Sequence, residues 1–464
     1  MKAVKYLIMG AMILGIHTTV LAQDYQSLIG PITNALKADP TNPNAGKDLV
    51  KNYLKLYKKN PEALVALGNT YLSVRNYTKA NEMADMAIKK NKNFGDAYVL
   101  KGDAEALQDD GGNAALWYEQ AMHLDPTNPH GYISYANVYR KRDPQLMQQT
   151  MDRLKQAVPG YPVDAVTGHA FFSTDLARAY ENYAKADVSK LDNNYLYEYV
   201  QSAYYTNHKE EALQLAKRGM QKNAGDEYES YYARFALYSA VDLEKMDEAK
   251  RYLDIMKAAD KEFNAKDHLY FGQTYISTGQ FEDAIAAHEK SLSMDEKAIE
   301  NYRHLSTAHK ALGNEEKQLE YSERYLSVAA APKPSDFVNL ANAYLAKAKA
   351  GDTDMYFEKA MGVYDNMAAK YPTIASWAWL QQANEGKTFD KMDYAISKYK
   401  EVVNTLGDKA DRNESETSYL KDALTNLGVL IWNADGMDAA KPYYQKLIEI
   451  DPNNETAKKV LGLE

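Results

Sequence analysis

The sequence contains no cysteine among its 464 residues, so the fold cannot rely on disulfide bonds, and no cysteine is present to carry a lipid anchor. Phenylalanine and tryptophan are scarce, at 10 and 4 residues, whereas tyrosine occurs 38 times. Tyrosine suits half-buried positions, because its ring packs while its hydroxyl reaches a polar partner or water. The composition therefore predicts a fold held by packing alone, with many amphipathic interfaces.

An excess of positive charge is also missing, since 64 acidic residues outnumber 55 lysines and arginines and the formal net charge is -9. Nucleic-acid binding depends on neutralising phosphates with a basic face. We therefore expect no nucleic-acid partner. Hydrophobic residues at 45% and charged residues at 26% are close to ordinary globular values, so the chain is expected to fold.

Long apolar runs are absent beyond the N-terminus. Residues 1–22 have the pattern of a signal peptide, with Lys2 and Lys5 before the apolar run 6–16 and a small-residue cleavage site ending at Ala22. The mature chain would then begin at Gln23. An uncleaved membrane anchor is the alternative, although the run is shorter than the roughly 20 residues of a spanning helix. We expect an exported protein without stable membrane insertion after cleavage, either periplasmic or associated with the outer membrane through a partner.

The remaining sequence repeats itself. Small residues recur 34 positions apart, as in the pairs Gly68 and Gly102, Ala80 and Ala114, and Ala87 and Ala121. Apolar residues around them follow two helical stripes separated by a short turn. Each unit is therefore predicted to be a pair of helices that pack closely where the small residues lie.

This pattern resembles the tetratricopeptide repeat family, whose template has a small residue at position 8, alanines at 20 and 27, and an aromatic residue at 24. The blocks starting at Pro61, Gly95, Ala265 and Lys421 match it well, and weaker copies start near Pro129, Asn193, Ser230, Ile299, Pro334 and Ile374. The resemblance implies an all-α fold, a right-handed α-solenoid of helix-turn-helix repeats. It covers most of the chain after residue 23.

Three segments depart from the template. Prolines and glycines interrupt residues 142–192, so we predict a kink or domain boundary near Gly160. The predicted organisation is an N-terminal array over 23–162, followed over 163–464 by an irregular helical segment, a second array and a capping helix at 455–463. Seven residues around 350–354 are expected to lie in a turn, and residues 407–418 in an exposed loop.

No catalytic or cofactor motif satisfies the spacing that its chemistry requires. The sequence has no HExxH motif, and His304 and His309 are too far apart on a helix to share a metal ion. The segment Gly386-Lys-Thr388 lacks the first glycine of a phosphate-binding loop, because position 381 is Gln381. Paired carboxylates such as Glu210 and Glu211 are typical of solvated helix faces. We therefore expect no enzyme activity and no cofactor.

The resemblance places ligand contacts on the first helix of each repeat, which lines the concave groove of the solenoid. An asparagine at template position 9 often bonds the backbone of an extended peptide in the family, and nearby basic groups would favour a carboxylate. The candidate partner-binding residues are Asn69, Asn137, Arg140, Lys141, Tyr197, Gln201, Tyr204, Tyr270, Gln273, Arg303, Lys310 and Asn342. The two-carboxylate clamp of chaperone-binding members is not reproduced, because Val65 and Val99 stand where a basic residue is needed.

The function expected from these features is that of a non-catalytic scaffold in the cell envelope, which binds a peptide segment or partner helix in the concave groove. The alternative is a carbohydrate-binding module that stacks exposed tyrosines against sugar rings. The number of solvent-facing tyrosines on the inner surface distinguishes the two. The sequence leaves the oligomeric state open.

Overall fold

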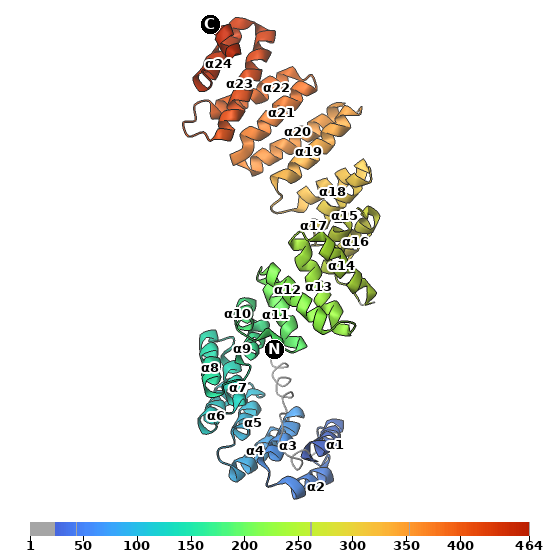
Figure 1. The fold of residues 1–464 in the computed structure, drawn as a ribbon, viewed down its shortest axis with the longest axis vertical. Helices are drawn as coiled ribbons and strands as arrows, with labels where there is room; N and C mark the ends of the chain where they lie inside the picture. Colours follow the sequence, from blue (N-terminus) through green and yellow to red (C-terminus); the bar gives the residue numbers. More distant parts are fainter. Residues whose placement is uncertain (1–23, 43, 260–261, 352, 464) are drawn as a thin grey trace. The chain divides into compact units, whose positions relative to one another are not determined.

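The computed structural model describes residues 24–42, 44–259, 262–351 and 353–463, and these residues form helices and turns with no β-strand. The predicted signal peptide lies outside the described residues. The chain divides into two compact units, of which unit 1 ends at Leu243 and unit 2 begins at Glu244. Each unit is a stack of antiparallel helices (Figure 1).

Unit 1 contains the helices α1 (Asp24–Ala38), α2 (Lys47–Tyr57), α3 (Pro61–Ser73), α4 (Tyr77–Lys90), α5 (Gly95–Ala106), α6 (Gly111–Leu124), α7 (Pro129–Tyr139), α8 (Pro144–Ala157), α9 (Val163–Phe172), α10 (Leu176–Tyr183), the 3₁₀ turn η2 (Val188–Lys190), α11 (Asn193–Tyr205), α12 (Lys209–Lys222) and α13 (Glu227–Asp242).

Unit 2 contains α14 (Met246–Ala258), α15 (Ala265–Ser277), α16 (Phe281–Met294), α17 (Glu300–Ala311), α18 (Glu315–Val328), α19 (Pro334–Lys349), α20 (Thr353–Lys370), η3 (Pro372–Ile374), α21 (Ala375–Thr388), α22 (Met392–Leu406), α23 (Glu414–Asp435), α24 (Met437–Ile450) and α25 (Glu455–Leu461).

Helices pair in chain order within each unit, as in α3 with α4, α5 with α6, α15 with α16 and α23 with α24. The first helix of one pair also packs on the first helix of the next. In unit 1 this joins α1 to α3, α3 to α5, α5 to α7, α9 to α11 and α11 to α13, and in unit 2 it joins α15 to α17 and α21 to α23. The first helices therefore lie side by side in the rows α1–α3–α5–α7 and α9–α11–α13 of unit 1 and in the pairs α15–α17 and α21–α23 of unit 2. The prediction of an α-solenoid built from helix-turn-helix repeats is confirmed.

Close approach of the two helices in a pair depends on a glycine that faces a ring. A Cβ built on Gly102 would lie 2.3 Å from a ring carbon of Tyr118, and one on Gly272 would lie 2.4 Å from the His288 ring. Gly428 lies against Tyr444 in the same way. The small residue predicted at template position 8 is thus required because an aromatic ring of the second helix occupies the space where a side chain would be.

The turns inside the pairs use a left-handed residue two positions before the second helix begins. Gly279 and Gly313 have positive φ there, and Arg75, Asp109 and Asp390 adopt φ values of 58–64° at the equivalent places.

Asparagine and aspartate side chains cap the N-termini of many helices. Asn60 caps α3, for example, by accepting from the backbone N–H groups of residues 62 and 63, which otherwise lack an acceptor.

The segment predicted to be irregular holds a shortened helix pair. Pro159 and Pro162 lie in the loop before α9, and α9 and α10 have only 10 and 8 residues. The two helices nevertheless pack on each other, with Gly168 against the ring of Tyr183. The boundary between compact units lies after Leu243, whereas the sequence analysis had placed a boundary after residue 162.

Two local predictions were wrong. The seven residues that this repeat has beyond the template do not form a longer turn. The helix α19 continues to Lys349 and α20 begins at Thr353, so most of the added residues lengthen these two helices. Residues 414–418 were expected in a loop but begin α23. The reason is a capping box in which Asn413 and Glu416 each accept the other's backbone N–H, at 2.9 and 3.1 Å. The predicted C-terminal capping helix is present as α25, with Ala457 and Val460 buried.

Candidate partner-binding surfaces

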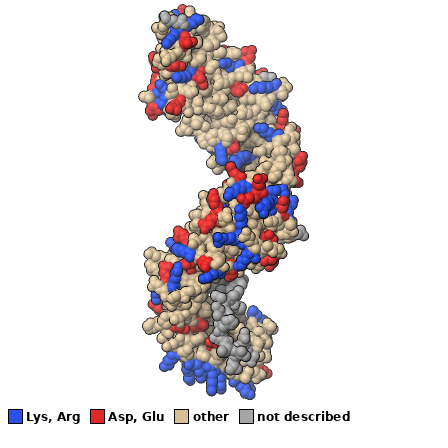
Figure 2. Space-filling model, in the orientation of Figure 1, with Lys and Arg blue, Asp and Glu red and all other residues tan. Residues whose placement is uncertain are grey.

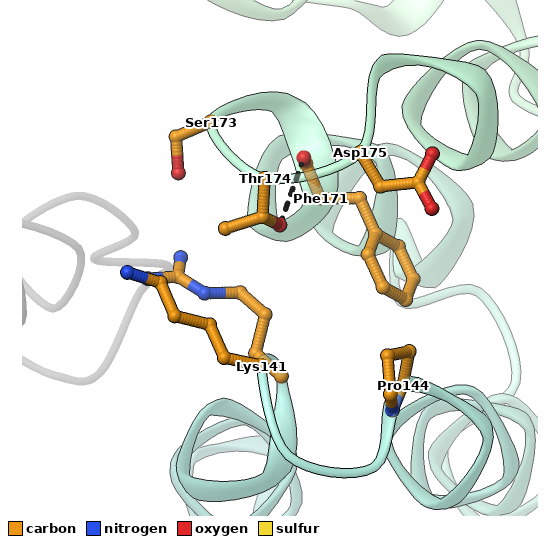
Figure 3. A pocket seen from close by; sticks show the side chains of 7 residues that line it. Lys141, Pro144, Phe171, Ser173, Thr174 and Asp175 are labelled. Atoms are coloured by element: carbon orange, nitrogen blue, oxygen red, sulfur yellow. Dashed lines mark hydrogen bonds between the residues drawn. The ribbon is translucent and has the colours of Figure 1, made fainter.

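A pocket of about 400 Å³ opens in unit 1 where the turn after α7 faces the turn between α9 and α10. Its lining residues are Arg140, Lys141, Pro144, Phe171, Ser173, Thr174 and Asp175. Figure 3 shows Lys141 beneath Ser173 and Thr174 on one side, and Pro144 facing the Phe171 ring on the other. The pocket therefore has a polar, basic side and an apolar side.

Arg140 is fixed in this pocket by the neighbouring helix pair. One terminal nitrogen donates to the backbone oxygen of Ala170 at 3.2 Å, while its Nε is buried without a hydrogen-bond partner. Burial lowers the pKa of the Arg140 guanidinium, because the charged form loses hydration. Lys141 is exposed and forms no ion pair with any residue that the structure describes. Two of the four sequence-predicted basic residues, Arg140 and Lys141, thus line one pocket.

The carboxylate of Asp175 in the pocket is already used by α10. One oxygen accepts the backbone N–H of Arg178 at 3.0 Å, and the other lies 3.5 Å from the Arg178 Nε. The hydroxyl of Thr174 donates to the backbone oxygen of Phe171 at 3.2 Å. Neither Arg140 nor Lys141 forms an ion pair with Asp175, the carboxylate that lines the pocket with them, so both cations can contact an anionic group such as a peptide carboxylate.

The sequence-predicted amides lie on first helices. Asn69 is exposed on α3, and Asn137 and Gln201 are half-buried on α7 and α11; in unit 2, Gln273 is half-buried on α15 and Asn342 is exposed on α19. Among the described residues no hydrogen bond is formed by any of these five side chains. Each amide therefore keeps both its donor and its acceptor for another molecule or for water.

An aromatic cluster on α11 and α13 brings two of the predicted tyrosines together. The centroid of the Phe235 ring lies 5.7 Å from that of Tyr197 and 5.5 Å from that of Tyr204. Tyr204 is only 4% exposed, and its hydroxyl bonds Oδ2 of Asp242 at 3.1 Å. The amide of Gln201 lies between the two tyrosines along α11. Tyr204 therefore contributes mainly to packing, and Tyr197 offers its half-exposed ring.

In unit 2 the remaining predicted residues lie on α15 and α17. Tyr270 is buried, with Nζ of Lys266 5.8 Å from its ring centroid. Arg303 pairs with Glu300 at 2.7 Å and covers the Tyr325 ring, so its charge is partly satisfied within the unit. Lys310 is exposed near the end of α17. These side chains do not converge on one pocket as Arg140 and Lys141 do.

The aromatic side chains of α13 were not predicted as part of the binding surface. Tyr228, Tyr231, Phe235 and Tyr238 recur at spacings of three and four residues along this helix; the Tyr228 ring contacts the Tyr231 ring, and the Phe235 ring contacts the Tyr238 ring. That spacing is visible in the sequence and marks a single aromatic stripe. It was overlooked because the template assigns only one aromatic position to a first helix.

Two histidines of unit 2 stack on each other, of which His288 is fully buried and His304 is half-buried. Nδ1 of His288 is 2.7 Å from Oδ1 of Asn301, and the His288 and His304 rings stack with centroids 4.9 Å apart. Burial lowers the pKa of His288 to about 4 and that of His304 to about 3.

Among the described residues no group of three or more histidine, aspartate or glutamate side chains is arranged to hold a metal ion. None of the helices described is both long and apolar enough to cross a bilayer.

Comparison with known proteins agrees with this architecture. A family model described as tetratricopeptide repeat matches residues 271–298 and 422–454, which belong to α15–α16 and α23–α24. The cell division cycle protein 27 homolog of Caenorhabditis elegans is 29% identical over 93 residues, which are 20% of this chain and 12% of that protein.

The solved structures that align with this chain share little sequence with it. The C-terminal part of a TPR repeat-containing protein from Cytophaga hutchinsonii is 17% identical, covers 57% of this chain and 99% of its own, and has a TM-score of 0.46. A chain of the APC/C hetero-tetramer Cut9-Hcn1 is 12% identical over 95% of this chain and 96% of its own, with a TM-score of 0.34.

The helix pairs, their glycine-to-ring contacts and the family match define the class. The chain contains tetratricopeptide repeats, matched in sequence at residues 271–298 and 422–454 and built as helix pairs along both units. Proteins of this class generally mediate protein–protein interactions.

Proposed function

We propose that this protein is a non-catalytic interaction scaffold of the cell envelope, and that it binds a peptide segment or helix of a partner along the first-helix face. The export signal predicted in residues 1–22 supports the envelope setting. The partner lies across first helices that pack side by side, such as α3, α5 and α7 in unit 1.

The main support for the proposal is the set of side-chain amides on these helices that form no hydrogen bond within the described part of the chain. Asn137 and Gln201 are half-buried, where an unmade hydrogen bond costs more than at a fully exposed site. The fully buried amides among the described residues each form at least one hydrogen bond, as Asn301 does with His288 and Ser291. A peptide backbone supplies the donor and acceptor that each free amide lacks.

The pocket beside Arg140 extends the same surface. A partner carboxylate, from an acidic side chain or a chain terminus, would find two cations there, and the apolar Phe171 and Pro144 would receive a neighbouring side chain. Substitution of Lys141 tests the role of this pocket without removing an internal contact, because Lys141 is exposed and makes no ion pair in the described part of the chain.

The test places a photo-crosslinking amino acid at first-helix positions 69, 137 and 201 and, as a matched set, at the exposed second-helix positions Glu119, Gln149 and Gln214. Crosslinks formed in the native cells are identified by mass spectrometry. The identified partner is then purified and its affinity measured for the parent chain, for the combined Asn69→Ala, Asn137→Ala and Gln201→Ala variant, and for Lys141→Glu.

We expect one protein to be captured at the first-helix positions and not at the second-helix positions. Its affinity should be about tenfold lower for both variants than for the parent chain. Equal capture from both sets would place the binding surface elsewhere. The envelope setting is tested separately by cell fractionation and by reading the N-terminus, which should be Gln23.

The carbohydrate-binding alternative gains no support from the tyrosines. Template tyrosines such as Tyr71, Tyr118 and Tyr444 are buried, and Tyr205 and Tyr228 are the only tyrosines exposed by more than a third in the part of the chain that the structure describes. A stacking platform for sugars needs open ring faces. Most of the tyrosine excess is therefore used in packing.

A further inference from the structure

A row of polar side chains crosses the first helices of unit 1. Asn69 on α3, Asp103 on α5 and Asn137 on α7 follow one another at intervals of 34 residues, and each comes directly after the small residue of its repeat. The helix α5 packs on α3 at one side and on α7 at the other. The three side chains therefore take the same place on consecutive helices, and Asp103 is the acidic member between two amides.

Asp103 has no cationic partner inside the protein. Its Oδ1 accepts from the Tyr118 hydroxyl at 2.7 Å, but its Oδ2 accepts no hydrogen bond and the carboxylate forms no ion pair among the described residues. Asp96, seven residues earlier on the same side of α5, is by contrast paired with His130 at 2.8 Å and bonded by the Asn128 amide at 2.7 Å. Asp103 is half-buried, and burial raises its pKa to about 6 because the charged form loses hydration.

Charges of the opposite sign lie at the end of the next first helix. Arg140 keeps helical backbone angles three residues after Asn137, so it lies about 60° from Asn137 around the axis of α7. Lys141 lines the same pocket as Arg140, and neither residue forms an ion pair with a residue that the structure describes. The first-helix side of unit 1 therefore carries an unpaired acid on α5 and two unpaired bases after α7.

Burial distinguishes these groups from the other charges of the surface. Figure 2 shows lysine and arginine side chains gathered at the end of unit 1 that carries α2 and α4. A partner gains little from pairing with charges that are exposed and hydrated. Asp103 and Arg140 are half-buried, and the Nε of Arg140 is buried without a hydrogen-bond partner, so an opposite charge stabilises these two groups more.

We propose that the partner segment is an extended chain with a lysine or arginine that pairs with Asp103 and an aspartate or glutamate that enters the pocket of Arg140 and Lys141. This partner chemistry rests on the proposed function, since it requires a segment that lies across the first helices. The segment is extended because the amides of Asn69 and Asn137, on either side of Asp103, need backbone groups that a helix bonds internally.

The positions of the two sites set the spacing of the two charges in the partner. Axes of helices packed side by side are about 8–10 Å apart, and the pocket lies about 5–6 Å farther along α7 than the row of Asp103. The two sites are therefore about 9–12 Å apart, which an extended chain spans in three or four residues at about 3.3 Å per residue. A helical partner would need about seven residues for the same distance.

The test selects ligands from a display library of random peptide segments that are fused at both ends, so that neither terminus is free. Selections use the parent chain, Asp103→Asn, Asp103→Lys and Lys141→Glu. Asp103→Asn removes the charge but keeps an oxygen that accepts from the Tyr118 hydroxyl. The matched controls are Glu119→Gln on α6 and Lys89→Glu on α4, two exposed second-helix residues without ion pairs in the described part of the chain. Circular dichroism confirms that each variant is folded.

Segments selected by the parent chain and by both controls should carry a basic and an acidic residue three or four positions apart. Asp103→Asn should no longer select the basic residue, Asp103→Lys should select an acidic residue in its place, and Lys141→Glu should no longer select the original acidic residue. The affinity of a parent-selected segment, measured by fluorescence anisotropy, should fall by about tenfold for Asp103→Asn.

Selected segments without this pair of charges, or with a spacing of about seven residues, would overturn the proposal while leaving the proposed function intact, because segments would still bind. Equal affinity of the parent chain and Asp103→Asn for the same segment would also overturn it. If the parent chain selected no segment at all, the result would contradict both this partner chemistry and the proposed function.

Discussion

Gly102 and Tyr118 are in such close contact that a single added carbon does not fit between them. A Cβ on Gly102 of α5 would lie 2.3 Å from Cε1 of the Tyr118 ring on α6. The same tyrosine is held in place at its other end, where its hydroxyl donates to Oδ1 of Asp103 at 2.7 Å. The ring therefore cannot move aside without breaking this bond, and the contact sets the distance between the two helices.

We expect Gly102→Ala to destabilise unit 1 by about 1–3 kcal/mol, because overpacking outweighs the usual helix preference for alanine. The control is Gly112→Ala on α6, where a Cβ meets nothing closer than 3.6 Å, so the change should be neutral or slightly stabilising. Thermal unfolding followed by circular dichroism measures both. A Gly102→Ala protein as stable as the parent would show that the ring has room to move.

Glu211 joins three helices through two tyrosine hydroxyls. Its Oε1 accepts from Tyr199 of α11 at 2.5 Å, and its Oε2 accepts from Tyr180 of α10 at 2.7 Å. Burial and the bond to Glu211 raise the pKa of Tyr180 to about 12. Glu211→Ala leaves both hydroxyls without an acceptor, and we expect a loss of about 1–3 kcal/mol in the free energy of unfolding.

The neighbouring Glu210 is the matched control, since it is exposed and makes no hydrogen bond within the described residues. Glu210→Ala should change stability by less than about 0.5 kcal/mol. Urea unfolding of the two variants and the parent compares them directly. Similar losses for both substitutions would mean that helix charge, and not the tyrosine bonds, explains the effect.

The repeat architecture was predictable because its main determinant is local. The small residues that recur at intervals of 34 mark close contacts between helices: Gly102 lies against Tyr118 inside its pair, and Gly68 lies against Leu100 on the first helix of the next pair. The pair α9–α10 was not predicted, since Pro159 and Pro162 suggested a break. The prolines lie before the helix, where they cost no backbone hydrogen bond.

The candidate surface was predictable only in part. Asn137 and Gln201 lie on first helices, and Arg140 and Lys141 line one pocket, but their opposing residues come from a helix pair about 30 residues further along the chain. Glu211 was interpreted as part of a solvated face because helical periodicity says nothing about a tyrosine on another helix. Contacts between repeats depend on how the pairs stack, which a single-repeat template does not describe.

Substitution of a left-handed turn residue by glycine is predicted to stabilise the protein, unlike the substitutions of Gly102 and Glu211. Asp390 has a φ of 58°, a conformation that costs less for glycine than for any residue with a side chain. We expect Asp390→Gly to stabilise unit 2 by about 0.5–1 kcal/mol. Asp393→Gly, three residues later in the first turn of α22, should destabilise it by about 1 kcal/mol, because glycine disfavours a helix. Unfolding temperatures that fall for both variants would contradict the role assigned to the turn.

The stacked histidines of unit 2 predict sensitivity to acid. Burial lowers the pKa of His288 to about 4 and of His304 to about 3, so the folded chain binds fewer protons than the unfolded chain, where histidine titrates near 6.5. Stability is therefore complete above about pH 6.5 and falls as the pH decreases toward 4, by roughly 1–2 kcal/mol for each histidine at pH 5.

Replacing His304 by phenylalanine keeps a ring against His288 and removes one of the two titrating groups. The groups that face this pair are Arg303, Asn301 and the backbone of Gly272, none of which titrates between pH 4 and 7. His304→Phe should lose about half as much stability as the parent chain between pH 7.5 and pH 5, measured as the shift of the unfolding temperature of unit 2. An unchanged pH dependence would show that the acid sensitivity arises elsewhere, because a neutral ring at this position cannot take up a proton.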